Sequence, residues 1–166
     1  MLLTMLSNQG TWVGRLAPDF KLQNQDGIWI TLDDLLQPGP LMLAFYPGDF
    51  TPVCTRQLCS YQEAFEQFVK YGIQVVGISP NAPESHIEFI EKYHFTFPLL
   101  SDPGKETIRL YGVTSLFMLG GMSRAVFILG KDKKVRYRYV EPTPLTRRKP
   151  DELLRILDDL HRRGKV

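Results

Sequence analysis

The sequence of 166 residues has little cysteine, little net charge and no long apolar run. Two cysteines are too few for the disulfide framework of a secreted scaffold, so we expect reduced thiols and a cytoplasmic location. A net charge of +2 is too small to indicate nucleic acid or an anionic membrane as the main partner. No apolar run approaches the ~20 residues of a membrane-spanning helix, so we expect no membrane partner.

The N-terminus, MLLTMLSNQG, has an apolar run but lacks the basic start and the small-residue cleavage site of a signal peptide. We interpret residues 1–13 as a terminal extension and residues 1–166 as a single domain, because this length suits one hydrophobic core.

The apolar pattern predicts an α/β protein. A hairpin is expected around Asp26-Gly27, and the continuous apolar runs at 41–46 and 73–79 are typical of strands buried on both faces. Further strands are expected at 98–100, 124–129 and 135–140, and helices at 31–36, 52–71, 83–93, 104–111 and 150–163. The strand–helix–strand order over 41–79 requires a right-handed parallel crossover, and the late hairpin adds antiparallel strands. The order fits a thioredoxin-like fold, a mixed central sheet with helices on both faces.

Both cysteines lie in PGDFTPVCTRQLC, where Thr51 is a good helix N-cap and Pro52 suits the first helical position. Cys54 then occupies the third helical position, where a capping box would place Glu or Gln because free amides and the helix dipole favour an anion. The same environment favours thiolate, the reactive form of cysteine.

Other interpretations of the cysteines stay open on spacing alone. Cys54 would also suit a small buried apolar site. A zinc site needs about four ligands, and His86, His94 and His161 are scattered without paired spacing, so we expect no metal. A CxxC redox motif is absent because four residues separate Cys54 from Cys59.

Several motifs resemble those of peroxiredoxins. The family signature Pro-x-x-x-Thr-x-x-Cys matches Pro47, Thr51 and Cys54, and a second cysteine five residues later, Cys59, is similar to the Q-type, or bacterioferritin-comigratory, subgroup. Arg124, in SRAVFIL, matches the family's active-site arginine. The segments APDF at 17–20, SH at 85–86, FPLLSD at 97–102 and YGV at 111–113 also resemble the family, in the same order. Ala125, Gly130 and Gln62-Glu63 depart from residues frequent in the subgroup.

The resemblance implies a peroxidase that uses no cofactor. Cys54 would attack hydrogen peroxide or an alkyl hydroperoxide and become a sulfenic acid, with Thr51 aligning the peroxide. Arg124 would stabilise the Cys54 thiolate and the charge that develops on the leaving oxygen, and Pro47 would shield the thiolate from water. Cys59 would form a disulfide with Cys54, which thioredoxin or a glutaredoxin would reduce.

Alone, Arg124 is also compatible with a surface ion pair, and His86 is expected on a helix surface or in packing. We also expect a monomer or weak homodimer. Two alternatives remain for the function: a protein thiol–disulfide oxidoreductase, and a non-enzymatic redox sensor or chaperone-like binder with the same cysteine pair.

Overall fold

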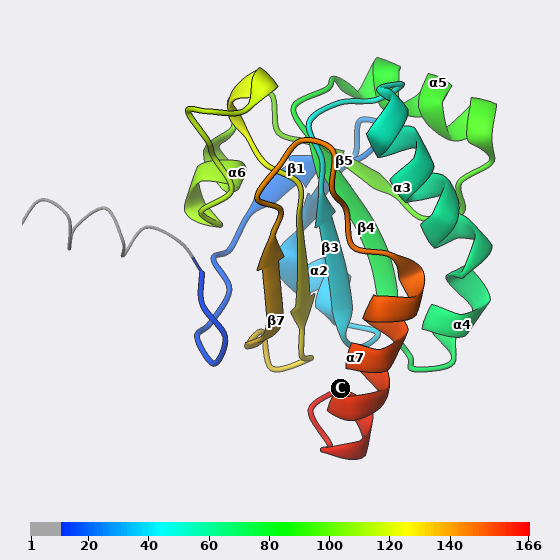
Figure 1. Ribbon diagram of the computed structural model, residues 1–166, viewed down its shortest axis with the longest axis vertical. Helices are drawn as coiled ribbons and strands as arrows, with labels where there is room; N and C mark the ends of the chain where they lie inside the picture. The colour runs from blue at the N-terminus through cyan, green and yellow to red at the C-terminus, as the bar shows by residue number, and fades with distance from the viewer. Residues whose placement is uncertain (1–10) are drawn as a thin grey trace, which may run out of the picture.

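The computed structural model describes residues 11–166. Within them, strands form one sheet in the order β2-β1-β5-β4-β3-β6-β7 (Figure 1). The strands are β1 (Lys21–Gln23), β2 (Trp29–Thr31), β3 (Leu41–Phe45), β4 (Gln74–Ser79), β5 (Leu99–Ser101), β6 (Ala125–Leu129) and β7 (Val135–Val140). The helices are α2 (Leu32–Leu36), α3 (Pro52–Glu63), α4 (Phe65–Val69), α5 (Pro83–Tyr93), α6 (Glu106–Leu110) and α7 (Pro150–Arg162), with a 3₁₀ turn at Leu119–Gly121.

The sheet is mixed, as the sequence predicts. β3 pairs parallel with β4, which confirms the crossover through the helices between them, and β6 joins β3 antiparallel. β1 and β2 form the predicted antiparallel hairpin. The proposed extension at 1–13 falls largely outside the described residues; of its described part, Thr11 is buried.

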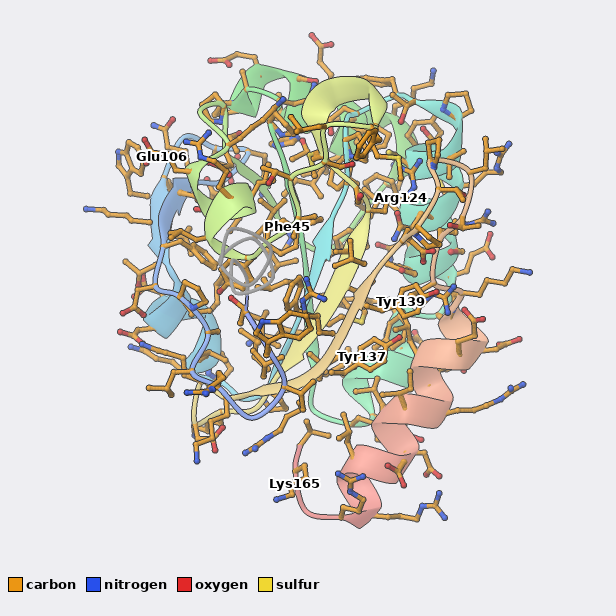
Figure 2. The ribbon with its side chains drawn as sticks, turned by 60° about the vertical axis from the view of Figure 1, so that its left-hand side comes forward. Phe45, Glu106, Arg124, Tyr137, Tyr139 and Lys165 are labelled. Carbon is orange, nitrogen blue, oxygen red and sulfur yellow. The ribbon has the colours of Figure 1, made fainter. Side chains whose placement is uncertain are left out.

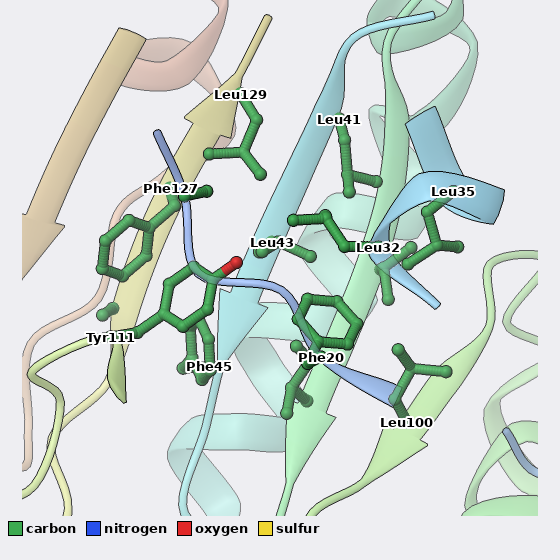
Figure 3. Close-up of a cluster of buried hydrophobic side chains, with 14 of the residues drawn as sticks. Phe20, Leu32, Leu35, Leu41, Leu43, Phe45, Leu100, Tyr111, Phe127 and Leu129 are labelled. Atoms are coloured by element: carbon green, nitrogen blue, oxygen red, sulfur yellow. The ribbon is translucent and has the colours of Figure 1, made fainter. Parts of the chain in front are cut away.

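Side chains of β3 alternate between two cores because successive residues of a strand point to opposite faces. Leu41, Leu43 and Phe45 pack with α2 and α6 on one face (Figure 3). Met42, Ala44 and Tyr46 pack on the other face, which α3, α4, α5 and α7 cover. Helices therefore lie on both faces, as predicted.

The expected single helix over 52–71 is wrong in one respect. Ala64 leaves helical geometry, with φ −92° and ψ 4°, and separates α3 from α4. Apolar periodicity continues across the break because Tyr61 and Phe68 still reach the same core. A periodic pattern reports the buried face, and it does not report a local change of backbone direction.

In the part of the chain that the structure describes, no helix combines the length and the apolarity needed to cross a bilayer.

Candidate active site

The site is built where α3 begins, beyond the end of β3. Thr51 is the N-cap residue, Pro52 begins the helix, and Cys54 occupies the third helical position, as the sequence predicts. The capping itself differs, because the Thr51 hydroxyl makes no cap hydrogen bond and donates to the Gly48 carbonyl at 2.9 Å. The hydroxyl therefore closes the turn before α3, and its oxygen can still accept a hydrogen bond.

Cys54 is fully buried, with a side chain among the apolar residues between the sheet and α3. The burial fits the alternative of a small apolar residue, but one polar contact distinguishes this cysteine. The Arg124 Nη1 group donates to Cys54 Sγ at 2.6 Å. Since a guanidinium is always charged and donates strongly, this contact gives the buried sulfur a cationic hydrogen-bond donor.

Arg124 directly precedes β6 and is 6% exposed, so the surface ion-pair alternative is wrong. Figure 2 shows the residue at the end of the sheet where α3 begins, with Tyr137 and Tyr139 farther along β7. Its other nitrogens donate to main-chain carbonyls, Nη2 to Pro144 at 2.6 Å and Nε to Thr146 at 3.3 Å. Each of the three guanidinium nitrogens therefore donates to an acceptor.

Cys59 lies on the same helix, five residues after Cys54, and both cysteines are free. The side chain is partly exposed. Burial, and secondarily the Glu63 carboxylate, raise the pKa of the Cys59 thiol. Near neutral pH, Cys59 therefore remains protonated and is a weak nucleophile.

Pro47 is half-buried in the turn that follows β3. The structure thus brings Pro47, Thr51 and Cys54 into one turn and helix start, as their spacing predicts, and adds Arg124 from 70 residues away. Cys59 lies on the same intact helix as Cys54, and no disulfide joins the two.

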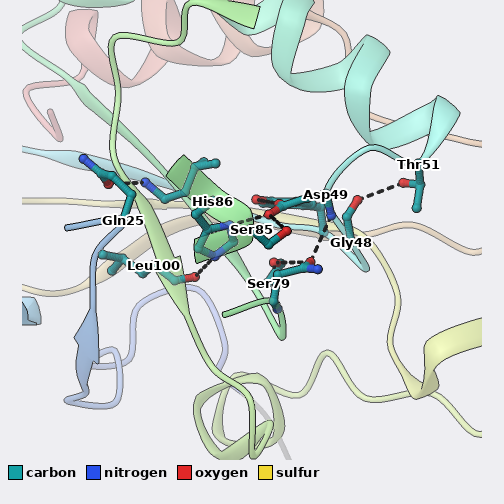
Figure 4. A network of polar contacts seen from close by, with 11 residues as sticks. Gln25, Gly48, Asp49, Thr51, Ser79, Ser85, His86 and Leu100 are labelled. Atoms are coloured by element: carbon teal, nitrogen blue, oxygen red, sulfur yellow. Dashed lines mark hydrogen bonds and ion pairs between the residues drawn. The ribbon is translucent and has the colours of Figure 1, made fainter. Parts of the chain in front are cut away.

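A buried network of polar side chains centred on Asp49 stabilises this turn, and the sequence did not predict it. The Asp49 carboxylate accepts from Tyr46 Oη at 2.6 Å and from Ser85 Oγ at 2.8 Å, and it contacts His86 Nδ1 at 2.7 Å (Figure 4). His86 Nε2 donates to the Leu100 carbonyl at 3.1 Å, and its ring is fully buried. Burial, with the nearby Asp49 charge, raises the pKa of Tyr46 and keeps this phenol a neutral donor.

The network connects the active-site turn to Tyr46, the residue after β3, and to α5 and β5. Of the two roles expected for His86, packing is confirmed and a helix-surface position is wrong. The sequence signal for a buried His86 was its place, with Ser85, at the start of the helix that follows the buried strand 73–79. The turn that the Asp49 network supports includes Phe50, whose φ of 63° lies in the left-handed region. This conformation costs about 1–3 kcal/mol and persists where the surrounding structure fixes it.

Among residues 11–166, no group of three or more His, Cys, Asp or Glu side chains is placed to hold a metal ion. The chemistry available from the described side chains is that of a buried cysteine beside an arginine, with a second thiol on the same helix.

Comparison with known proteins agrees with this arrangement. The model of the AhpC/TSA family matches residues 13–138. A protein of Oryza sativa subsp. indica named putative peroxiredoxin Q, chloroplastic, is 38% identical over 126 residues, which are 76% of this chain and 58% of that protein. A protein of Helicobacter pylori named putative peroxiredoxin bcp is 41% identical over 122 residues, which are 70% of this chain and 80% of that protein. The chain thus spans less than two thirds of the Oryza sativa relative and most of the Helicobacter pylori one.

Solved structures extend the likeness to the fold. Peroxidoxin BcpB from Mycobacterium tuberculosis superposes with a TM-score of 0.80 at 29% identity, over 90% of this chain and 98% of that one. Xanthomonas campestris peroxiredoxin Q superposes with a TM-score of 0.77 at 26% identity, over 91% and 97% of the two chains. These neighbours confirm the thioredoxin-like fold that the sequence predicts.

Proposed function

The chain belongs to the AhpC/TSA family, within which its relatives carry peroxiredoxin Q and bcp names, and from this membership we propose that it is a thiol-dependent peroxidase. Its substrates are hydrogen peroxide and organic hydroperoxides. The observation that carries the proposal is the 2.6 Å contact between Arg124 Nη1 and the buried Cys54 sulfur. A cation at that distance supplies what a peroxide-cleaving cysteine needs, a stabilised thiolate inside a dry site.

In the first step, the Cys54 thiolate attacks one peroxide oxygen. The S–O bond forms as the O–O bond breaks, the sulfur is oxidised to a sulfenic acid, and the leaving oxygen takes a proton to become water or an alcohol. Negative charge moves from sulfur to the leaving oxygen. The Arg124 guanidinium, which already donates to the sulfur, lies close enough to share its donors with that oxygen as charge develops.

Thr51 aligns the peroxide in this scheme. Its hydroxyl proton is already engaged by the Gly48 carbonyl at 2.9 Å, so the oxygen is available as an acceptor. A hydroperoxide O–H donating to that oxygen would be held next to the start of α3. Pro47, which has no N–H and lies in the same turn, shields the sulfur from water.

Cys59 resolves the oxidised enzyme. Its sulfur attacks the Cys54 sulfenic sulfur, an S–S bond forms, and the sulfenic oxygen leaves as water. The raised pKa of the Cys59 thiol disfavours its own reaction with peroxide and so separates the two roles. A dithiol protein of the thioredoxin or glutaredoxin type then exchanges with the disulfide, becomes oxidised itself and restores both thiols.

Steady-state peroxide consumption with thioredoxin and its reductase tests the proposal. Turnover with hydrogen peroxide and alkyl hydroperoxides supports it, and absence of turnover with every dithiol supplied contradicts it. Reduction of insulin disulfides without peroxide would instead indicate a protein thiol–disulfide oxidoreductase. Stoichiometric oxidation without turnover would indicate a redox sensor.

Two further parts of the proposal concern the setting of the protein. A cytoplasmic location is proposed because two cysteines are too few for the disulfide framework of a secreted scaffold; cell fractionation tests it. A monomer or weak homodimer is proposed for the assembly, and sedimentation over a concentration series tests that state.

A further inference from the structure

The connection between β7 and α7, residues 141–149, determines the direction of the Arg124 guanidinium. We name this segment the strap. Figure 1 shows it in orange, crossing the end of the sheet on its way to α7. Its Pro144 and Thr146 carbonyls accept from two Arg124 nitrogens at 2.6 and 3.3 Å, which leaves Nη1 aimed at Cys54. Because an arginine side chain is long and flexible, its aim depends on where these two carbonyls lie.

The middle of the strap adds no side chain to either core, and the hydrogen bonds of Thr143 and Thr146 with each other are local. Residues 142–146 are all exposed, and Leu145 is 77% exposed. A segment with few buried contacts opens at little cost in free energy, so its carbonyls stay fixed only if its ends are anchored.

The first anchor is at Glu141. Its main-chain N–H donates to the Arg124 carbonyl at 2.8 Å, so the strap begins beside the residue that it orients. Its carboxylate is buried and accepts from Arg148 Nε at 2.8 Å. The Arg148 guanidinium lies 3.8 Å from the centre of the Tyr139 ring. The Glu141–Arg148 pair therefore closes the strap end to end.

The second anchor comes from α3, the helix that carries Cys54. Tyr61 Oη donates to the Arg148 carbonyl at 2.9 Å, and Gln57 Nε2 donates to Tyr61 Oη at 2.9 Å. Both side chains are fully buried, and Gln57 lies one turn before Tyr61. Burial raises the pKa of Tyr61, so its phenol remains a neutral donor throughout the physiological range. With its oxygen accepting from Gln57, its single proton points to Arg148.

We propose that Tyr61 is a positioning residue for the Cys54–Arg124 pair. It acts through the Arg148 carbonyl, which fixes the strap, and the strap carbonyls in turn aim the guanidinium at the sulfur. The proposal rests on the proposed function only in taking Cys54 as the reactive thiol. Nucleophile, arginine and anchor are thereby connected, through hydrogen bonds and the strap backbone, in a closed path that starts and ends on α3.

The test replaces Tyr61 by Phe, which removes one hydroxyl and keeps the ring. In a Cys59→Ser background, the rate of Cys54 alkylation by iodoacetamide is measured as a function of pH. Loss of one anchoring hydrogen bond should shift the profile to higher pH and lower the rate near neutrality about threefold to tenfold. The matched control is Tyr71→Phe. It removes a hydroxyl that donates to Asp158 at 3.4 Å, a hydrogen bond between the segment after α4 and α7. Its profile should equal that of the parent.

A double-mutant cycle distinguishes positioning from a general loss of structure. If Tyr61 acts through Arg124, then Tyr61→Phe has no further effect on the profile once Arg124 is Ala. Additive shifts, or a Tyr61→Phe profile identical to that of the parent, would overturn the proposal. If Tyr61→Phe does not fold, Glu141→Gln weakens the other anchor and should shift the profile in the same direction. The absence of a shift in that folded variant would also contradict the proposal. Alkylation needs no peroxide, so a protein without peroxidase turnover still gives a decisive answer here.

Discussion

Arg124 Nη1 lies 2.6 Å from Cys54 Sγ, although 70 residues separate the two in the chain. The contact joins the start of β6 to the first turn of α3, inside the protein, where 6% of the arginine and none of the cysteine is exposed. A charged hydrogen bond in such a place is stronger than at the surface because little water competes for either partner.

Replacement of Cys54 by Ser should abolish peroxide turnover. Serine is nearly isosteric, yet its hydroxyl has no accessible anion near neutral pH and therefore cannot attack the O–O bond at a useful rate. Loss of turnover is measured by peroxide consumption with thioredoxin, and circular dichroism verifies the fold. An appreciable residual rate in the folded variant would assign the nucleophile elsewhere.

Replacement of Cys59 by Ser should leave one rapid peroxide-consuming event per chain. The Cys54 sulfenic acid then persists, can be trapped by dimedone, and proceeds to sulfinic acid at excess peroxide because no resolving thiol intercepts it. Recycling by thioredoxin should fail, while a small added thiol can still react with the sulfenic acid. Full thioredoxin-dependent turnover of this variant would show that Cys59 does not resolve.

Arg124→Ala should slow peroxide attack by about 10²–10³, roughly 3–4 kcal/mol, because one preorganised donor to the developing oxyanion is lost. Stopped-flow kinetics with hydrogen peroxide measures the effect. Arg136→Ala is the matched control, since Arg136 pairs with Asp132 at 2.6 Å within the β6–β7 hairpin. An Arg124→Ala rate equal to that of the control would remove the guanidinium from the mechanism.

Oxidation should unwind the first part of α3. Residues five apart in an intact helix have Cα atoms roughly 8–9 Å apart, whereas a disulfide needs them within about 7 Å. Both cysteines lie in the single helix Pro52–Glu63, so the Cys54–Cys59 bond requires loss of helix over about Pro52 to Ser60. Hydrogen exchange on the two redox states should show lost protection in this segment and its packing neighbours. Equal protection, with the disulfide verified by mass, would contradict local unwinding.

His86→Leu should lower the free energy of unfolding by about 3 kcal/mol, because it leaves the buried Asp49 carboxylate without one of its partners. Tyr46 and Ser85 still donate to that carboxylate, which limits the loss. Urea denaturation measures the change, and His161→Leu on the exposed side of α7 is the control, with a change within about 0.5 kcal/mol. Equal stability of the two variants would show that the Asp49 network does not support the turn.

The sequence by itself determined the elements and the local start of the site. Alternation and continuous apolar runs predicted the strands, and helical spacing predicted α5 and α7 nearly to the residue, because these signals depend on which face of an element is buried. Thr51 and Pro52 fixed the first turn of α3 and so placed Cys54 at its third position, since capping and proline act within a few residues. The five-residue spacing of the cysteines, which an intact helix holds too far apart for a disulfide, is likewise a local property of the sequence.

Only the tertiary structure decided what surrounds the sulfur. No spacing rule connects Arg124 to Cys54, or the Pro144 and Thr146 carbonyls to that arginine; they meet because β3 and β6 are neighbours and the strap crosses the end of the sheet. The same holds for His86, which local pattern left undecided between surface and packing and which the fold buries against Asp49. The break at Ala64 and the left-handed Phe50 were likewise not predictable from the sequence, since neither residue type requires that backbone. Long-range pairing brings together groups whose separation along the chain carries no information about their distance in space, and it is there that the chemistry of this site is set.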